Sequence, residues 1–275
     1  MNINYEESCT KSGDGVALYV QAWKPENPQK KLFICHGYAE HGKRYDEFAH
    51  HCAQEGIETW TVDLRGHGKS EGARGFVDDF NHYLDDVQTL IDDNKSELPC
   101  FLLGHSLGGL ICLNYAQERG EGLSGLLISN PYLGLAMKVP ALKLKVADLA
   151  AKYAPRLSLP SGLDPKGISH DQAIVDAYRN DPLVFTTANA AWNREAVSAQ
   201  ERVLQKHAFS MPVFFAYSDA DPITCGKTNA DYAEKIQAPK TEVVLRAGEF
   251  HEIMNETNRQ ELHAMMSKWI METGN

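Results

Sequence analysis

Several features that would point to particular classes of protein are missing from these 275 residues. No apolar run approaches the roughly 18 residues of a membrane span, and the polar segment 1–11 lacks the apolar core of a signal peptide. Basic residues are few, 27 against 37 acidic ones, and the net charge is −10. This balance argues against nucleic acid as a partner, because phosphate contacts need a basic surface.

Sequence signatures of disulfides, cofactors and metals are missing as well. The six cysteines are scattered without a CxxC pair, so we expect reduced thiols and a cytoplasmic protein. The chain has no Walker A sequence, and its GxGxxG at 120–125 follows a helical pattern, the reverse of a dinucleotide site. The spacing from His36 to Glu40 and His41 is one residue too long for a HxxEH motif. We therefore expect neither a cofactor nor a metal.

Short apolar runs alternate with helical patterns along most of the chain. This alternation predicts an α/β fold with a mostly parallel central sheet flanked by helices. The runs typical of strands are 16–23, 31–35, 57–62, 100–103, 125–129, 213–217 and 242–245. The helical patterns cover 45–55, 77–94, 107–119, 228–236 and 259–272.

One long region interrupts the alternation. Residues 131–206 contain several prolines and no strand candidate, and the region is too long for a plain loop in a compact domain. We predict that 131–206 form a helical cap, or lid, inserted into a core made of 1–130 and 207–275.

A short glycine-flanked motif carries the first chemical signal. Residues 104–108 read Gly-His-Ser-Leu-Gly and match G-x-S-x-G, between a strand pattern and a helical pattern. In this context the motif forms a tight turn that exposes the serine at the carboxyl end of the sheet. Ser106 is therefore the candidate nucleophile, and we expect His105 to point away from the reacting groups.

A serine hydroxyl becomes a good nucleophile only when a base takes its proton. His251 and the aspartates Asp219 and Asp221 each follow a strand pattern, at the sheet edge where α/β proteins build their sites. We predict His251 as the base and favour Asp221 as the group that orients it. Asp221 precedes Pro222, and a residue before proline avoids the helical region, which suits a fixed loop position. Asp219 is then a solvated or turn-capping carboxylate.

Two backbone amides are candidates for the oxyanion hole. One donor should be the N–H of Leu107, directly after the nucleophile. The other should come from the loop after an early strand, where His36-Gly37-Tyr38 offers the N–H of Tyr38.

Together these motifs resemble the α/β-hydrolase superfamily, most closely its monoacylglycerol lipase and lysophospholipase group. The resemblance runs over nearly the whole chain, through 36–45, 63–72, 104–109, 178–183, 221–223 and 248–251. It implies an α/β-hydrolase fold and hydrolysis of long-chain acyl esters with a small head group, without cofactor or metal.

The resemblance also implies a polar pocket for a glycerol head group. The positions that match this pocket are Glu40, Arg44 and Tyr178. Glu40 and Arg44 have an alternative role as an ion pair that only holds their loop. The mammalian lipases carry a second histidine three residues after the catalytic one, and this chain has Met254 there.

Part of the cap has an apolar stripe with a basic flank. Between 137 and 156 the chain has five basic residues and one acidic residue, and its stripe comprises Leu135, Val139, Leu142, Val146, Leu149 and Tyr153. Such a surface can rest on anionic lipid, which would make the protein peripheral at a membrane. The alternative is a cap helix packed on the body with solvated lysines.

The resulting interpretation is a serine carboxylester hydrolase that acts on lipid esters, with monoacylglycerols as the first substrate candidates. A lysophospholipase or a broad-specificity carboxylesterase is the alternative. A non-catalytic binding member of the fold is a third interpretation, and the intact order of Ser106, Asp221 and His251 counts against it. The sequence makes no prediction of the oligomeric state.

Overall fold

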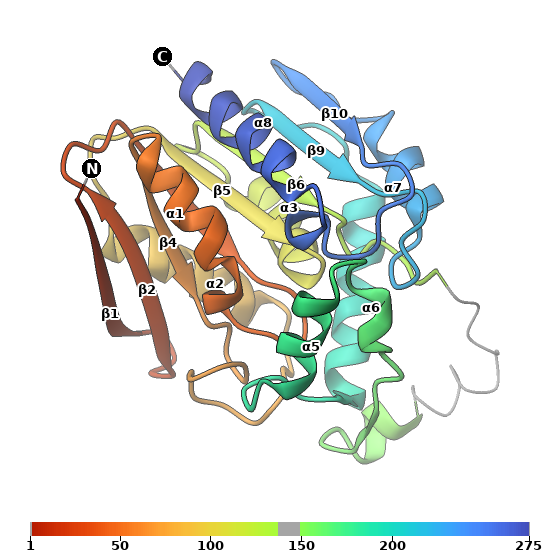
Figure 1. The fold of residues 1–275 in the computed structure, drawn as a ribbon. Coiled ribbons are helices and arrows are strands. Elements are labelled where there is room, and N and C mark those ends of the chain that lie inside the picture. Colours follow the sequence, from red (N-terminus) through yellow and green to blue (C-terminus); the bar gives the residue numbers. More distant parts are fainter. Residues whose placement is uncertain (1, 137–148, 275) are drawn as a thin grey trace.

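The computed structural model describes residues 2–136 and 149–274 of the chain. Its centre is an eight-stranded sheet in the order β1-β2-β4-β3-β5-β6-β9-β10 (Figure 1). The strands are β1 (Ile3–Lys11), β2 (Ala17–Pro25), β3 (Lys30–Cys35), β4 (Ile57–Val62), β5 (Cys100–His105), β6 (Gly125–Ser129), β9 (Val213–Tyr217) and β10 (Thr241–Leu245). Strands β4, β3, β5, β6, β9 and β10 run parallel to one another, whereas β1 and β2 are antiparallel to their neighbours. The predicted mostly parallel α/β sheet is confirmed.

Strand β1 is the element of the sheet that the sequence did not indicate. Most of its side chains are exposed, because it is the edge strand and pairs only with β2. An edge strand without a buried face has no apolar run, so the hydrophobic pattern that located the other strands was missing here.

Helices cover both faces of the sheet (Figure 1). Helices α1 (Asp46–Gln54) and α8 (Arg259–Glu272) pack together on one face, where Phe48 and Trp269 belong to a common apolar cluster. The other face carries α2 (Asn81–Asp93), α3 (Leu107–Arg119) and α7 (Gly226–Ala233). Both faces are buried, which explains the nearly continuous apolar character of the central strands.

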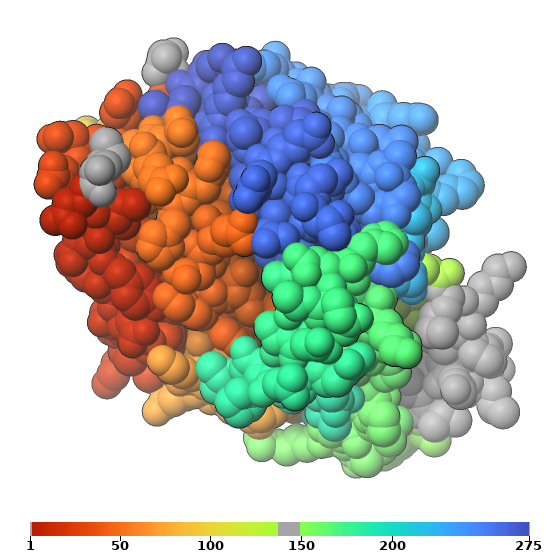
Figure 2. All heavy atoms as spheres, viewed as in Figure 1, coloured from red at the N-terminus to blue at the C-terminus, as the bar shows by residue number. Residues whose placement is uncertain are grey.

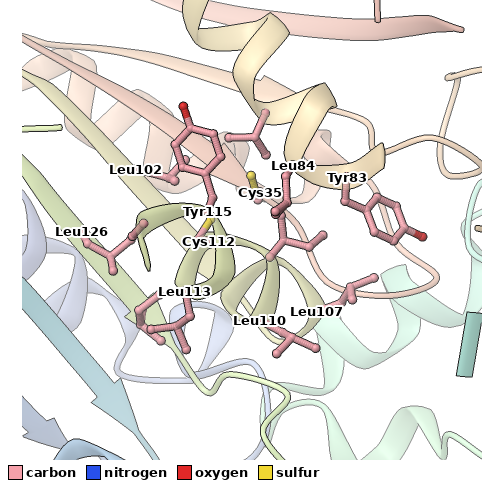
Figure 3. Close-up of a cluster of buried hydrophobic side chains, with 14 of the residues drawn as sticks. Cys35, Tyr83, Leu84, Leu102, Leu107, Leu110, Cys112, Leu113, Tyr115 and Leu126 are labelled. Atoms are coloured by element: carbon pink, nitrogen blue, oxygen red, sulfur yellow. The ribbon is translucent and has the colours of Figure 1, made fainter. Parts of the chain in front are cut away.

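Helix α3 lies at the centre of the larger core cluster (Figure 3). Leu110 and Leu113 of this helix are fully buried and pack with residues of the sheet and of α2. The helix approaches the sheet so closely that a Cβ on Gly108 would collide with the carbonyl oxygen of Cys35 in β3. A Cβ on Gly104 would collide with the carbonyl of Gly108. The two glycines of the motif are therefore steric requirements of the turn.

The segment between β6 and β9 contains small elements outside the main sheet. They are β7 (Ser158–Pro160), the 3-10 helix η2 (Pro165–Gly167), α5 (Gln172–Asn180), β8 (Thr187–Asn189) and α6 (Ala190–Leu204). The sequence indicated no strand here, but β7 and β8 form a three-residue antiparallel pair. In Figure 2 the green part of this segment lies across the boundary between the orange and blue parts of the chain.

Helix α6 packs on α3, and its Ala196, Ala199 and Val203 belong to the main core cluster. Elsewhere in the described part of this segment, the carbonyls of Gly167 and Ile168 accept from the amides of His251 and Glu252. The assignment of 131–206 as a separate cap remains a prediction.

Most of the predicted apolar stripe of the cap lies outside the described residues, including Val139, Leu142 and Val146. Residues 149–153 are helical, and Leu149 and Tyr153 are 60% and 71% exposed. Among the described residues no helix combines the length and the apolar character needed to cross a bilayer.

Candidate active site

Ser106 lies at the sharp turn between β5 and α3. Its backbone has φ 52° and ψ −115°, a conformation that L-residues rarely adopt and that costs about 1–3 kcal/mol. The backbone around it is held firmly, because its N–H donates to the carbonyl of Ser129 at 3.1 Å and its carbonyl accepts from the N–H of Tyr132 at 2.9 Å. The side chain lines a cavity of about 150 Å³. The turn thus presents the hydroxyl at the carboxyl edge of the sheet.

The structure brings His251 and Asp221 together beside the same cavity. The distance from His251 Nδ1 to Asp221 Oδ2 is 2.7 Å, and both side chains are almost fully buried. The Asp221 carboxylate also accepts from the N–H of Ile223 at 2.7 Å and from the hydroxyl of Thr224 at 2.5 Å. These donors fix the carboxylate so that it faces the imidazole. His251 Nε2 has no hydrogen-bond partner among the described residues and is free to act on a bound molecule.

Asp219, the alternative acid, lies elsewhere. Its carboxylate is in an exposed loop and accepts from the N–H of Gly248 at 2.8 Å. This contact is the turn-capping role that the sequence analysis gave as the alternative for Asp219.

The electrostatics of the pair follow from burial and proximity. Burial acts to lower the pKa of His251, but the charge and hydrogen bond of Asp221 outweigh it and raise the pKa above its ordinary value. Burial likewise acts to raise the pKa of Asp221, and the His251 and Thr224 contacts lower it overall. The aspartate therefore stays ionised at neutral pH and can stabilise an imidazolium.

The loop after β3 reaches the same point. A Cβ on Gly37 would lie 2.8 Å from Glu40 Oε1 and 3.3 Å from the Cβ of Ser106, so a side chain here would displace the Glu40 carboxylate and crowd Ser106. His36 fixes the loop from beneath, with Nε2 accepting from the N–H of Leu64 at 2.9 Å. In the described ranges, the amides of Tyr38 and Leu107 donate no hydrogen bond to any residue. Both residues line the cavity, so two unpaired donors are available there.

The three residues matched to a head-group pocket form one buried polar network. Glu40 accepts from Arg44 Nε at 2.8 Å, from the Tyr45 hydroxyl at 2.9 Å and from the Gly37 N–H at 2.6 Å. The Arg44 guanidinium lies 4.7 Å from the ring centre of Tyr178. Glu40 and Tyr178 line the cavity, whereas Arg44 lies behind them. The ion pair between Glu40 and Arg44, which the sequence analysis gave as an alternative role for these residues, is present.

Burial acts to raise the pKa of Glu40, but the Arg44 charge and the Gly37 N–H lower it to about 2. The carboxylate is thus charged over the whole physiological range.

Three nearby residues were not indicated by the sequence. Glu252, directly after His251, forms a short ion pair with Arg44 and lines the cavity. Asn130, fully buried at φ 38°, donates to the His251 carbonyl at 2.7 Å and accepts from the Ser218 N–H at 2.7 Å. Glu256 accepts from the amides of Phe250 and His170. For Glu252 and Glu256 the available signal was the pair of acidic residues after His251, and for Asn130 the sequence held no signal.

His105 is a correction to the expectation from the motif. Its ring centre lies 4.7 Å from that of His251, and the residue lines the cavity instead of pointing away from it. Burial and the neighbouring His251 lower the pKa of His105 to about 3, so it is neutral. Its Nδ1 donates to the carbonyl of Ser129 at 3.1 Å, which ties the ring to β6.

The remainder of the cavity wall is largely apolar. Trp192 lies against Tyr38 with ring centres 3.8 Å apart, and it stacks on Tyr132 at 6.1 Å. Aliphatic side chains from the 131–206 segment and the Asp221 loop complete the wall: Leu135, Leu163, Ile168 and Ile223. Across residues 2–136 and 149–274 no three His, Cys, Asp or Glu side chains gather as a metal site would require.

A mostly parallel sheet with a serine at a strained strand-to-helix turn and a His–Asp pair at the same edge defines an α/β-hydrolase. A family model described as serine aminopeptidase, S33 (Hydrolase_4) matches residues 26–258. The chain belongs to this family of serine hydrolases, within its monoacylglycerol lipase-like group.

Individual relatives are similar over most of the length of this chain. Monoglyceride lipase of Homo sapiens is 32% identical over 89% of this chain and 83% of its own. Phospholipase YtpA of Bacillus subtilis is 30% identical over 87% of this chain and 94% of its own. The chain spans only 28% of an uncharacterized abhydrolase domain-containing protein of Dictyostelium discoideum, to which it is 27% identical over 95% of this chain.

A solved structure shows the same architecture. The crystal structure of Paleococcus ferrophilus monoacylglycerol lipase matches with a TM-score of 0.84 and 25% identity, over 99% of both chains.

Proposed function

We propose that the chain is a serine carboxylester hydrolase in which Ser106 is the nucleophile, His251 the base and Asp221 the orienting acid. The observation that carries this proposal is the 2.7 Å contact of His251 with Asp221 beside the cavity that Ser106 lines. With Nδ1 engaged, the free Nε2 of His251 is the nitrogen that can take the serine proton.

The reaction then runs in two stages. Ser106 Oγ attacks the ester carbonyl carbon while His251 removes its proton, and the amides of Tyr38 and Leu107 bind the oxyanion. When the tetrahedral intermediate collapses, the imidazolium protonates the leaving alcohol and an acyl-enzyme remains. Water attacks the acyl group with His251 again as base, which releases the acid and restores Ser106.

The direct test of this assignment is labelling with a fluorophosphonate probe. We expect the probe to modify Ser106 and to stop ester hydrolysis in proportion to labelling. A folded protein that the probe does not label would instead support the non-catalytic binding interpretation.

We propose monoacylglycerols as the substrate class. The polar end of the cavity at Glu40 and Tyr178 suits a small hydroxylated head, and the apolar wall at Trp192 and Leu163 suits an acyl chain. Relatives whose names describe monoglyceride lipases support the same choice. The similarity to Phospholipase YtpA favours a lysophospholipase as the second candidate.

A hydrolysis panel separates these candidates. It compares monoacylglycerols of several chain lengths with lysophosphatidylcholine, triacylglycerol and an aminoacyl amide, the last because of the family description. We expect the highest kcat/KM for a monoacylglycerol. A preference for triacylglycerol or for the amide would contradict the small-head ester interpretation.

We also propose a cytoplasmic protein whose cap makes peripheral contact with anionic membranes. Its six cysteines are all free. The exposed apolar side chains Leu149, Tyr153, Leu157 and Leu159 lie within 149–159 of the chain, the stretch that also carries Lys152 and Arg156. The test is co-sedimentation with vesicles of anionic and of zwitterionic lipid, with stronger binding expected for the anionic set.

A further inference from the structure

Glu252 has one carboxylate oxygen without a partner. Its Oε2 receives the short ion pair from Arg44 and a hydrogen bond from Asn255 Nδ2 at 2.9 Å. Its Oε1 accepts no hydrogen bond from any residue in the described part of the chain. The residue is only 4% exposed, yet it lines the cavity. This oxygen is not among the buried atoms that lack a partner, so it is open to the cavity, where a hydroxyl of a bound ligand can donate to it.

The position of Glu252 places it on the side of the leaving alcohol. In the proposed reaction His251 protonates the leaving oxygen, so the alcohol lies next to His251, and Glu252 is the next residue along the chain. The backbone of this pair is fixed from the cap side, since the Glu252 N–H donates to the Ile168 carbonyl at 2.7 Å. On the core side Asn130 holds the His251 carbonyl at 2.7 Å. The carboxylate therefore has little freedom to turn away.

The charges around this point are unbalanced. Arg44 lies between Glu40 and Glu252, so two carboxylates share one guanidinium. The three side chains together carry one net negative charge when both carboxylates are ionised. Because the site is buried, this charge is screened weakly by solvent. It favours a neutral polyol and disfavours a phosphate next to the ester.

Tyr178 complements this arrangement. Its ring faces Arg44, its hydroxyl forms no hydrogen bond with the described residues, and it lines the same cavity. Glu252 thus supplies an acceptor and Tyr178 a hydroxyl that can donate or accept, as a vicinal diol requires.

We propose that Glu252 is a specificity-determining residue that accepts a hydrogen bond from a hydroxyl of the leaving alcohol and selects glyceryl esters over phosphate-bearing ones. This inference rests on the proposed ester hydrolysis at Ser106. It assigns a substrate contact to a residue beyond the matched head-group positions.

The test compares three soluble octanoyl esters that share one acyl group: 1-monooctanoylglycerol, methyl octanoate and octanoyl lysophosphatidic acid. We expect the wild-type kcat/KM to be higher for the glyceryl ester than for the phosphate ester. In Glu252→Leu the ratio of kcat/KM for the glyceryl over the methyl ester should fall about tenfold, the loss of one charge-assisted hydrogen bond. In Glu252→Gln the glyceryl-to-methyl ratio of kcat/KM should fall about threefold. The ratio of kcat/KM for the glyceryl over the phosphate ester should fall as well.

The matched control is Glu249→Gln, which removes a buried ion pair with Arg246 on the same loop but lies outside the cavity. This control should leave the glyceryl-to-methyl ratio within about twofold of wild type. An equal loss on the glyceryl and methyl esters in both Glu252 variants would overturn the proposal, because it would mean that Glu252 only holds Arg44 and His251 in place. A wild-type preference for the phosphate ester would overturn it too.

Failure of the proposed function looks different. In that case the wild-type protein hydrolyses none of the three esters and resists the fluorophosphonate probe. If Glu252→Leu does not fold, the isosteric Glu252→Gln variant still tests the proposal through the glyceryl-to-methyl ratio of kcat/KM.

Discussion

The carboxyl edge of the sheet, where the proposed triad lies, and the 131–206 segment differ in how they are built. At the edge, Ser106 and Asp221 follow the buried parallel strands β5 and β9, His251 follows the partly exposed parallel strand β10, and backbone hydrogen bonds hold their loops. In the 131–206 segment the elements β7, η2, α5 and β8 have nine residues or fewer, and only α6, with 15 residues, is long among the elements described there. Large apolar side chains such as Leu149, Tyr153 and Leu159 are exposed.

The difference separates two tasks. Proton transfer tolerates little positional error, so its groups belong on the rigid edge, where strands and glycine contacts leave few alternatives. Recognition of a flexible acyl chain tolerates more variation, which suits a segment of short elements. Substitutions at the edge should therefore lower kcat strongly. Substitutions of exposed side chains in the 131–206 segment should change the free energy of unfolding only slightly.

The largest effect is expected from Ser106→Ala. Removal of the nucleophile should lower kcat by a factor of about 10⁴ or more while the protein stays folded. The measurement is turnover of a chromogenic acyl ester beside a circular dichroism melt. Retained activity would remove Ser106 from the mechanism.

Asp221→Asn should follow, with a kcat loss of about 10³–10⁴-fold. Because Asp221 raises the pKa of His251, its removal should also move the acid limb of the kcat/KM–pH profile to lower pH. The raised pKa also has a consequence for stability. While Asp221 is ionised, the raised pKa of His251 stabilises the fold fully below the unfolded histidine pKa of about 6.5, and this stabilisation is lost as pH rises through the folded value.

Asp219→Asn is the matched control for this variant, since in residues 2–136 and 149–274 its carboxylate hydrogen-bonds only to the Gly248 amide. It should leave both the rate and the position of the acid limb close to wild type. A shift of the limb in this control instead of in Asp221→Asn would reverse the assignment of the acid.

Asn130→Ala tests how the two loops are held at the edge. Losing the contacts to the His251 carbonyl and the Ser218 amide should destabilise the protein by about 2–3 kcal/mol and lower kcat more than it raises KM. Asn114→Ala, a buried asparagine within α3, is the control for stability alone. If Asn130→Ala and Asn114→Ala have equal stability and equal kcat, Asn130 has no role in positioning the two loops.

The strained backbone of Ser106 predicts a smaller effect on stability. Ser106→Gly should be more stable than Ser106→Ala by about 1 kcal/mol, because glycine adopts φ 52° without the Cβ clash. For a chain of this size that corresponds to a rise in Tm of about 2–4 °C. Identical melting temperatures would show that the turn stores no strain.

The smallest effect on stability is expected on the cap. Tyr153→Ser should change the free energy of unfolding by no more than about 0.5 kcal/mol, because the side chain is 71% exposed. If the cap touches membranes, the same variant should weaken co-sedimentation with anionic vesicles. Loss of stability without loss of vesicle binding would indicate packing instead.

The comparison also explains which elements could be read from the sequence. The strands 57–62, 125–129 and 213–217 and the helices 107–119 and 259–272 were predicted with their observed bounds, because buried strands and long helices have strong apolar patterns. Strands β1 and β7 were missed, since most of their side chains face solvent and leave no such pattern. Strand β8 was missed because its three residues are too few for an apolar pattern.

For the site, the sequence by itself determined which turns and loops carry the candidate reacting groups. Glycines 104 and 108 demand a tight turn at Ser106, and strand order brings the Asp221 and His251 loops to the same edge. Only the tertiary structure decided which side chains meet there: Asp221 rather than Asp219 against His251, the ring of His105 inside the cavity, and Glu252 beside Arg44. The physical reason is distance along the chain, because contacts between residues more than 200 positions apart, such as Arg44 and Glu252, depend on packing that no local pattern records.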